Sequence, residues 1–249
     1  MSAAYAKLRG SLSTLQLRGI SARLEEEIQT AEAAKLSYAN FLQNVMSSEL
    51  DFRVDRRFRK NLSAAHFPVE KKLDTLEYGN MKGFGKMDAA GLLDFAWLDN
   101  HENLLFFGPP GLGKTHIAIG LGLRAVEKGY IVSFERMTSL LRLLKTSEVQ
   151  RSSSFRINRI LKSDLVIIDE IGYSPVEKRE ANLFFNLISE LYEKRSVVIT
   201  SNKGFDEWAE MMGDEVMTTA LLDRLLHHSK TFNLTGESYR IQNLSKEVK

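Results

Sequence analysis

The sequence predicts an α/β protein in which a parallel sheet flanked by helices follows a small all-helical domain. Two patterns support this fold class. Up to about residue 75, apolar residues recur at helical spacing. From about residue 100, short apolar runs alternate with amphipathic helices, which is typical of crossover units on a buried parallel sheet. A chain of 249 residues can form one substantial domain and a smaller one.

Helical periodicity dominates the first part of the chain. Apolar side chains recur at Leu8, Leu12 and Leu15, and then every four residues at Leu42, Met46, Leu50, Val54, Phe58 and Leu62. The pattern ends between Phe67 and Gly85, a stretch that contains one proline and several glycines. We therefore predict a helical domain at residues 1–75, which binds DNA or a partner, and a sheet domain at residues 76–249.

The second domain contains five apolar runs that we interpret as strands. They lie at residues 103–107, 131–134, 165–168, 197–200 and, with a weaker pattern, 231–234. Helices are predicted to begin near Gly113, Thr138, Lys178 and Thr218. We interpret the run of three serines at residues 152–154 as a short flexible joint.

Composition excludes several classes of protein. The chain has no cysteine, which rules out disulfides, thiolate catalysis and cysteine-based zinc modules. It shows no apolar stretch of membrane-spanning length, and its N-terminus lacks the apolar core of a secretion signal. We therefore expect a cytoplasmic protein with no membrane partner. The net charge of +2 leaves a polyanionic partner to be decided by the local charge distribution.

Residues 108–115, GPPGLGKT, match the phosphate-loop pattern GxxxxGK[ST], between an apolar strand and a helix as that motif requires. Glycines let the main chain wrap around phosphates, so that N–H groups and the positive end of the helix converge on them. Lys114 is expected to reach the β and γ phosphates of ATP, and Thr115 to ligate Mg²⁺. The predicted nucleotide-binding residues are Gly108, Pro109, Pro110, Gly111, Leu112, Gly113, Lys114, Thr115 and His116.

Polar side chains follow two further strands. Asp169 and Glu170 end the apolar run LVII, in the Walker B pattern, and Asn202 follows the run VVIT. Because ligands bind at the carboxyl ends of parallel strands, we expect these side chains beside the phosphate loop. Asp169 is predicted to hold Mg²⁺, and Glu170 to polarise the attacking water with help from Asn202.

These motifs together resemble those of the AAA+ ATPases. The sequence more closely resembles the IstB family of transposition helper ATPases, which are related to the DnaC helicase loaders. The resemblance rests on residues 83–91 (GFGKMDAAG), 168–196, 199–216 (ITSNKGFDEWAEMMGDEV) and 220–240 (ALLDRLLHHSKTFNLTGESYR). It implies an AAA+ core at residues 76–249, ATP hydrolysis, and a homo-oligomer that forms on duplex DNA with ATP and directs a partner transposase.

The resemblance also implies catalytic roles for two arginines. Arg224, in LLDRLLHHS, is similar to the arginine finger that reaches a neighbouring subunit's nucleotide, and Arg240, in GESYR, to a sensor within its own subunit. The sequence alone leaves these two roles interchangeable. The family's Walker A, Walker B and sensor positions correspond here to Lys114, Thr115, Asp169, Glu170 and Asn202.

Two basic stretches are candidates for DNA contact. The stretch from Arg136 to Lys162 precedes the Walker B strand, and we predict DNA contact by Arg142, Lys145, Arg151, Arg156 and Arg159. Solvated helix faces are the alternative. The cluster RVDRRFRK at residues 53–60 could equally well bind DNA, bind the transposase or form the solvent-exposed face of a long helix.

A helicase loader that binds single-stranded DNA is the alternative function, because its nucleotide chemistry would be the same. His227 and His228 suggest a metal site, but no third ligand lies at ligand spacing in the sequence. We therefore interpret them as histidines at a helix end.

Overall fold

The computed structural model describes residues 3–79 and 81–239. Internal contacts divide the chain into two compact units, Met1–Lys60 and Asn61–Lys249, and helix α3 (Tyr38–Ala65) runs from the first into the second. Residues 61–75 belong by their contacts to the second unit, whereas the sequence predicts them in the helical domain. The physical reason is packing, since Phe67 lies 6.1 Å from Phe134 between ring centroids.

The first unit contains α1 (Ala3–Thr14), α2 (Arg18–Ala34) and most of α3. Its small core consists of Leu12, Ile20, Leu24 and Val45. Part of the predicted apolar series does not join this core. Four side chains of the series are about half exposed: Leu42 at 55%, Met46 at 50%, Leu50 at 62% and Val54 at 55%.

A buried carboxylate caps α2. Glu49 accepts hydrogen bonds from the main-chain N–H groups of Gly19 and Ile20, at 2.7 and 3.1 Å, where the N-cap residue Leu17 has no side chain that could accept them. Burial raises the pKa of Glu49, but hydrogen bonds from Arg53 and from the two N–H groups outweigh burial and lower that pKa below its usual value. Glu49 thus joins α2 to α3 as an ion.

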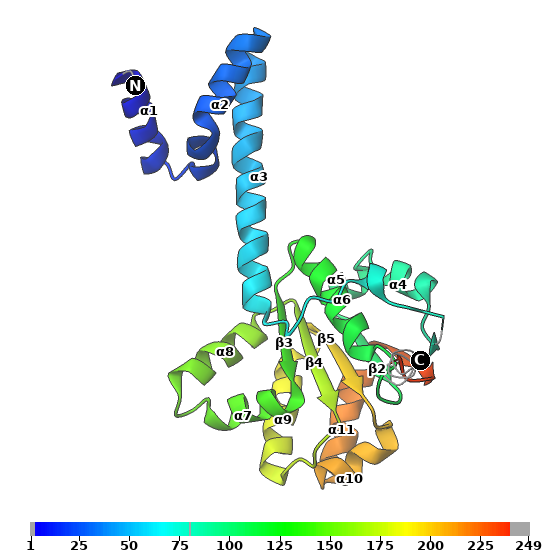
Figure 1. The fold of residues 1–249 in the computed structure, drawn as a ribbon. Helices are drawn as coiled ribbons and strands as arrows, with labels where there is room; N and C mark the ends of the chain where they lie inside the picture. Colours follow the sequence, from blue (N-terminus) through cyan, green and yellow to red (C-terminus); the bar gives the residue numbers. More distant parts are fainter. Residues whose placement is uncertain (1–2, 80, 240–249) are drawn as a thin grey trace, which may run out of the picture. The chain divides into compact units, whose positions relative to one another are not determined.

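The second unit is built on a five-stranded parallel sheet in the order β3-β4-β5-β2-β6 (Figure 1). Its strands are β2 (Asn103–Phe107), β3 (Val132–Arg136), β4 (Leu165–Ile171), β5 (Ser196–Ser201) and β6 (Ser229–Asn233). Strands β2, β3, β4 and β5 are almost entirely buried because helices cover both faces of the sheet, whereas β6, at one edge, is largely exposed. This exposure explains its weaker sequence pattern.

Helices form a layer on each face of the sheet (Figure 1). On one face α6 (Lys114–Glu127) packs so closely that a Cβ added to Gly122 would lie 2.7 Å from Ile167. Between Phe67 and α6 the chain forms the short helix η1 (Leu73–Thr75), and α4 (Lys86–Leu92) and α5 (Ala96–Asp99) follow it. The opposite face carries an extensive apolar cluster. Five helices contribute to it: α7 (Met137–Thr146), α8 (Arg151–Leu161), α9 (Lys178–Leu191), α10 (Trp208–Met212) and α11 (Glu215–Leu226).

The predicted strands are all present, with shifted ends, and the predicted helices begin within a few residues of their expected starts. The predicted joint at residues 152–154 is wrong, because these serines lie in the first turns of α8. Ser153 is buried, and its hydroxyl lies 2.8 Å from that of Thr146 in α7. The sequence also gave no sign of the small antiparallel pair β1 (Met81–Lys82) and β7 (Thr235–Gly236), or of η2 (Phe205–Glu207). Among the described residues, no helix is both long and apolar enough to cross a membrane.

Candidate active site

The loop between β2 and α6 has the conformation that its glycines allow. Gly108 has a φ of 139°, and a Cβ at that position would lie 2.1 Å from the carbonyl oxygen of Leu234. Gly113, the N-cap of α6, has a φ of 87°. Residues 108–113 therefore wrap tightly in front of the helix, whose first N–H groups point into the loop.

Lys114 lies at the centre of this loop. Its side chain is buried, and its ammonium group donates hydrogen bonds to the carbonyl oxygens of Gly108 at 2.5 Å and Pro109 at 2.8 Å. A positive charge is thus held where the loop N–H groups converge. This is the arrangement that binds a chain of phosphates.

Asp169 is fully buried at the carboxyl end of β4. Its Oδ1 atom accepts hydrogen bonds from the hydroxyl groups of Thr115, at 2.8 Å, and Thr200, at 2.5 Å. Its Oδ2 atom has no hydrogen-bond partner among the described residues. A buried carboxylate oxygen without a partner costs free energy, and a divalent cation with its waters would satisfy it.

Glu170 is turned out of the sheet by an irregular main chain. Its φ is 65°, in the left-handed region, and the register of β4 with β5 shifts between Ile168 and Ile171. Such a conformation costs about 1 to 3 kcal/mol and is concentrated at functional sites. The carboxylate faces Arg136, at the end of β3, with 3.5 Å between Oε2 and Nε.

Three of the predicted catalytic side chains, Lys114, Glu170 and Asn202, line one cavity of about 540 Å³. Its wall includes Lys114, Thr115, Glu170, Asn202 and the loop residues 110–113. Asn202 has a buried Oδ1 atom without a hydrogen-bond partner in the described part of the chain. The structure therefore brings the phosphate loop together with both later strand ends.

Another part of the wall comes from residues that the sequence analysis did not select for the nucleotide site. They are Pro68, Val69, Lys71, Thr75, Leu76, Glu77 and Met81, together with Arg136, Tyr173, Glu237 and Tyr239. His116, predicted to touch nucleotide, holds this wall, because its Nε2 atom lies 2.7 Å from the carbonyl oxygen of Lys72 and 3.3 Å from the Thr75 hydroxyl. Segments this far apart in sequence leave no local signal of their meeting.

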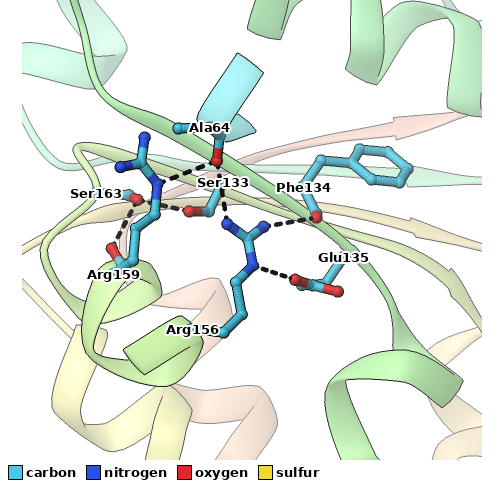
Figure 2. A network of polar contacts seen from close by, with 7 residues as sticks. All are labelled: Ala64, Ser133, Phe134, Glu135, Arg156, Arg159 and Ser163. Carbon is cyan, nitrogen blue, oxygen red and sulfur yellow. Dashed lines mark hydrogen bonds and ion pairs between the residues drawn. The ribbon is translucent and has the colours of Figure 1, made fainter. Parts of the chain in front are cut away.

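Two of the predicted DNA-contacting arginines lie in an internal network instead (Figure 2). Arg156 donates hydrogen bonds to Glu135 at 2.5 Å, to the carbonyl oxygen of Phe134 at 3.1 Å and to that of Ala64 at 3.1 Å. Arg159 donates to the same Ala64 oxygen at 3.0 Å. Both guanidinium groups thus meet the last turn of α3, where carbonyl groups carry partial negative charge.

We predict that Arg156→Met destabilises the second unit strongly. The side chains of Arg156 and Glu135 are each 10% exposed, so that removal of the arginine leaves a buried, unpaired carboxylate. The expected loss of unfolding free energy is about 3 to 5 kcal/mol, measured by denaturant unfolding. Arg151→Met, on the exposed side of the same helix, is the matched control and should cost less than about 0.5 kcal/mol. Equal effects would contradict the network's role.

The other basic candidates differ in their surroundings. Lys145 donates a hydrogen bond to the Glu180 carboxylate at 2.9 Å, and this bond, together with the charge of Glu180, raises the pKa of Lys145. Arg142 and Arg151 are exposed, and Arg151 lies over the exposed ring of Phe155 at 5.9 Å from the ring centroid. Exposed cations at Arg142 and Arg151 are therefore the best placed to meet a polyanion.

The two late arginines remain predictions. Arg224 lies in the last turn of α11, 4.7 Å from the ring centroid of Phe185, and it does not line the cavity. A role at a nucleotide would therefore require a neighbouring subunit. Arg240 lies outside the described residues.

Known proteins with similar sequences include ATP-binding proteins of insertion sequences. Residues 10–247 match the model of a protein family described as IstB-like ATP binding protein. The chain is 38% identical over 235 residues to an insertion sequence IS21 putative ATP-binding protein from Pseudomonas aeruginosa, covering 94% of this chain and 89% of the relative. It is 33% identical over 248 residues to the corresponding IS232 protein of Bacillus thuringiensis, covering 99% of both chains.

Solved structures of replication proteins share the fold. The crystal structure of DnaI has a TM-score of 0.55 at 16% identity, covering 68% of this chain and 89% of that chain. AMPPCP-bound DnaA from Aquifex aeolicus has a TM-score of 0.54 at 17% identity, covering 74% of this chain and 56% of that chain. At this identity the likeness extends to the fold alone.

Proposed function

This chain belongs to the family of IstB-like ATP-binding proteins, and on that premise we propose that it is a DNA-binding AAA+ ATPase of transposition. It assembles on duplex DNA with ATP and directs a partner transposase to its target site. The observation that carries the proposal is the convergence of the phosphate loop, Glu170 and Asn202 on one cavity, with Asp169 hydrogen-bonded to the cavity residue Thr115.

The cavity suits ATP with Mg²⁺. The loop N–H groups and Lys114 would bind the phosphates, while Pro68, Val69, Leu76 and Met81 supply apolar surface for the nucleoside. Thr115 and Asp169 fit a magnesium site because they are oxygen ligands that already touch and because Asp169 Oδ2 has no other partner among the described residues. Mg²⁺ bound there supplies charge neutralisation for the phosphate oxygens.

Glu170 and Asn202 act on the attacking water. Glu170 accepts the proton of that water, and its left-handed main chain directs the carboxylate into the cavity. Arg136, on the neighbouring strand, holds the carboxylate through their ion pair. Asn202 orients the same water through its side-chain amide.

Arg224 and the exposed basic residues address partners outside the subunit. We assign Arg224 to the nucleotide of a neighbouring subunit, because it lies outside its own cavity wall. Arg142 and Arg151 are assigned to the phosphate backbone of DNA. In the first unit, the exposed Arg56 and Arg57 of the cluster at residues 53–60 are further candidates for phosphate contact.

The DNA assignment predicts a change in salt dependence. The double variant Arg142→Ala/Arg151→Ala should bind duplex DNA more weakly, and the slope of log affinity against log salt should fall by about two, because each lost phosphate contact removes about one. Fluorescence anisotropy with labelled duplex measures both quantities.

The control removes the same charge elsewhere. Arg124→Ala/Lys128→Ala changes two exposed residues at the far end of α6, and its affinity and slope should stay close to those of the unmodified protein. Equal losses in both double variants would indicate that net charge alone governs the binding and would contradict the assignment.

A further inference from the structure

We propose that Glu193, His227 and His228 form a binding site for a transition-metal ion such as Zn²⁺. One ligand atom from each residue lies within 4.8 Å of the other two. The sequence shows only the two adjacent histidines, since the carboxylate comes from the end of a different helix. This site lies outside the nucleotide cavity and is independent of the proposed function.

The three side chains converge because two helices end at the same place. Leu191 is the last residue of α9 and Leu226 the last of α11, and these helices pack side by side. Glu193 has a φ of 57°, which turns the chain just after α9. Its carboxylate lies 3.8 Å from Nδ1 of His227, and the two imidazole centroids are 4.1 Å apart.

Electrostatics at this point favours a cation. The last carbonyl groups of a helix carry about half a negative charge, and here the ends of α9 and α11 come together. Glu193 adds a full negative charge, and Asp223 lies in the last turn of α11. The cations nearby are the Arg224 side chain, which is held over Phe185, and Lys194 on the exposed turn.

Tyr192 is placed to accept a hydrogen bond from the His227 ring nitrogen that does not bind the metal, as is usual for metal-bound histidines. Its hydroxyl oxygen lies 2.8 Å from Nδ1 of His227. When this oxygen accepts from the Nδ1–H group, the Nε2 atom of the same ring is free to bind a metal.

The ligand set selects the kind of metal. Two imidazoles and one carboxylate suit Zn²⁺, Ni²⁺ or Co²⁺, whereas Mg²⁺ prefers a shell of oxygen ligands. Three protein ligands leave a coordination position for water. All three residues are exposed, so a metal ion reaches them directly from solvent.

A bound ion would also hold the helix that carries Arg224. His227 follows Arg224 by one helical turn, and Glu193 belongs to the turn after α9. A metal between them would fasten the end of α11 to the end of α9. The position of Arg224 would then depend on the metal, which is a consequence of the site and not a premise for it.

The test is a titration of the untagged, full-length protein with Zn²⁺ by calorimetry, repeated with Co²⁺ by visible absorption. We expect one ion per chain, displaced by a chelator and unaffected by excess Mg²⁺. His228→Ala and Glu193→Gln should each weaken binding by about tenfold or more, and Tyr192→Phe by a smaller factor. Circular dichroism confirms that each variant is folded.

The matched controls are His101→Asn, which removes a histidine elsewhere, and Glu190→Gln, which removes an exposed carboxylate of α9. Both should bind the ion as the unmodified protein does. If all variants bind alike, or if the unmodified protein binds none, the proposed site is overturned.

Discussion

Glu170→Gln is expected to bind ATP normally and to lower its steady-state turnover by about 10²- to 10⁴-fold. Glutamine has the shape of glutamate but cannot accept the proton of the attacking water. Among the described residues, the substitution removes the half-exposed ion pair of the carboxylate with Arg136 at 3.5 Å, and such pairs contribute little to stability. Nucleotide affinity is measured with a fluorescent ATP analogue, and turnover by phosphate release.

Lys114→Ala separates binding from chemistry. Its ammonium group lies in the phosphate loop, so this variant should lose nucleotide affinity as well as turnover. Glu170→Gln should lose turnover alone. Normal turnover by Glu170→Gln would show that another group accepts the proton, and the assignment of Glu170 would be wrong.

Arg224→Ala should have an effect of comparable or greater size on turnover, a loss of about 10³- to 10⁵-fold. An arginine finger uses its planar fork of donors to neutralise charge that develops on the transferred phosphoryl group. Because Arg224 does not line its own cavity, nucleotide binding by the variant should be unchanged. Thermal unfolding shows whether loss of its contact with Phe185 has disturbed the fold.

Mixing two inactive variants tests whether Arg224 acts between subunits. A Glu170→Gln subunit retains its arginine, and an Arg224→Ala subunit retains its cavity. At an interface where the first faces the second, one complete site forms, so the mixture should recover part of the activity that each variant lacks alone. No recovery at any ratio of the two proteins would contradict action in trans.

The sequence alone was enough to predict the sheet and the side chains that line the cavity at the ends of its strands. Strands β2 to β5 are buried apolar runs, and the predicted side chains lie at or just after the carboxyl ends of strands, so their meeting at one sheet edge is a consequence of parallel topology. The predictions for Lys114, Thr115, Glu170 and Asn202 rest on such local patterns, and all four line the cavity.

The remaining features depend on contacts between distant segments. Arg136 appeared only as part of a basic stretch, and its pairing with Glu170 arises because β3 and β4 are neighbours. In the sequence, Arg156 and Arg159 look like exposed cations, but in the structure both donate hydrogen bonds to a carbonyl oxygen at the end of α3. A run of serines weakly favours a loop, yet burial of Ser153 and Ile160 holds those residues in a helix.

Light scattering on the Glu170→Gln protein with ATP and Mg²⁺ tests the central claim most directly. The protein is compared with duplex DNA, with single-stranded DNA and without DNA, at about 50 and about 200 mM salt. We predict large particles that require both ATP and duplex and that shrink at the higher salt. Assembly on single strands alone would favour a helicase loader, and no response to DNA would contradict the account.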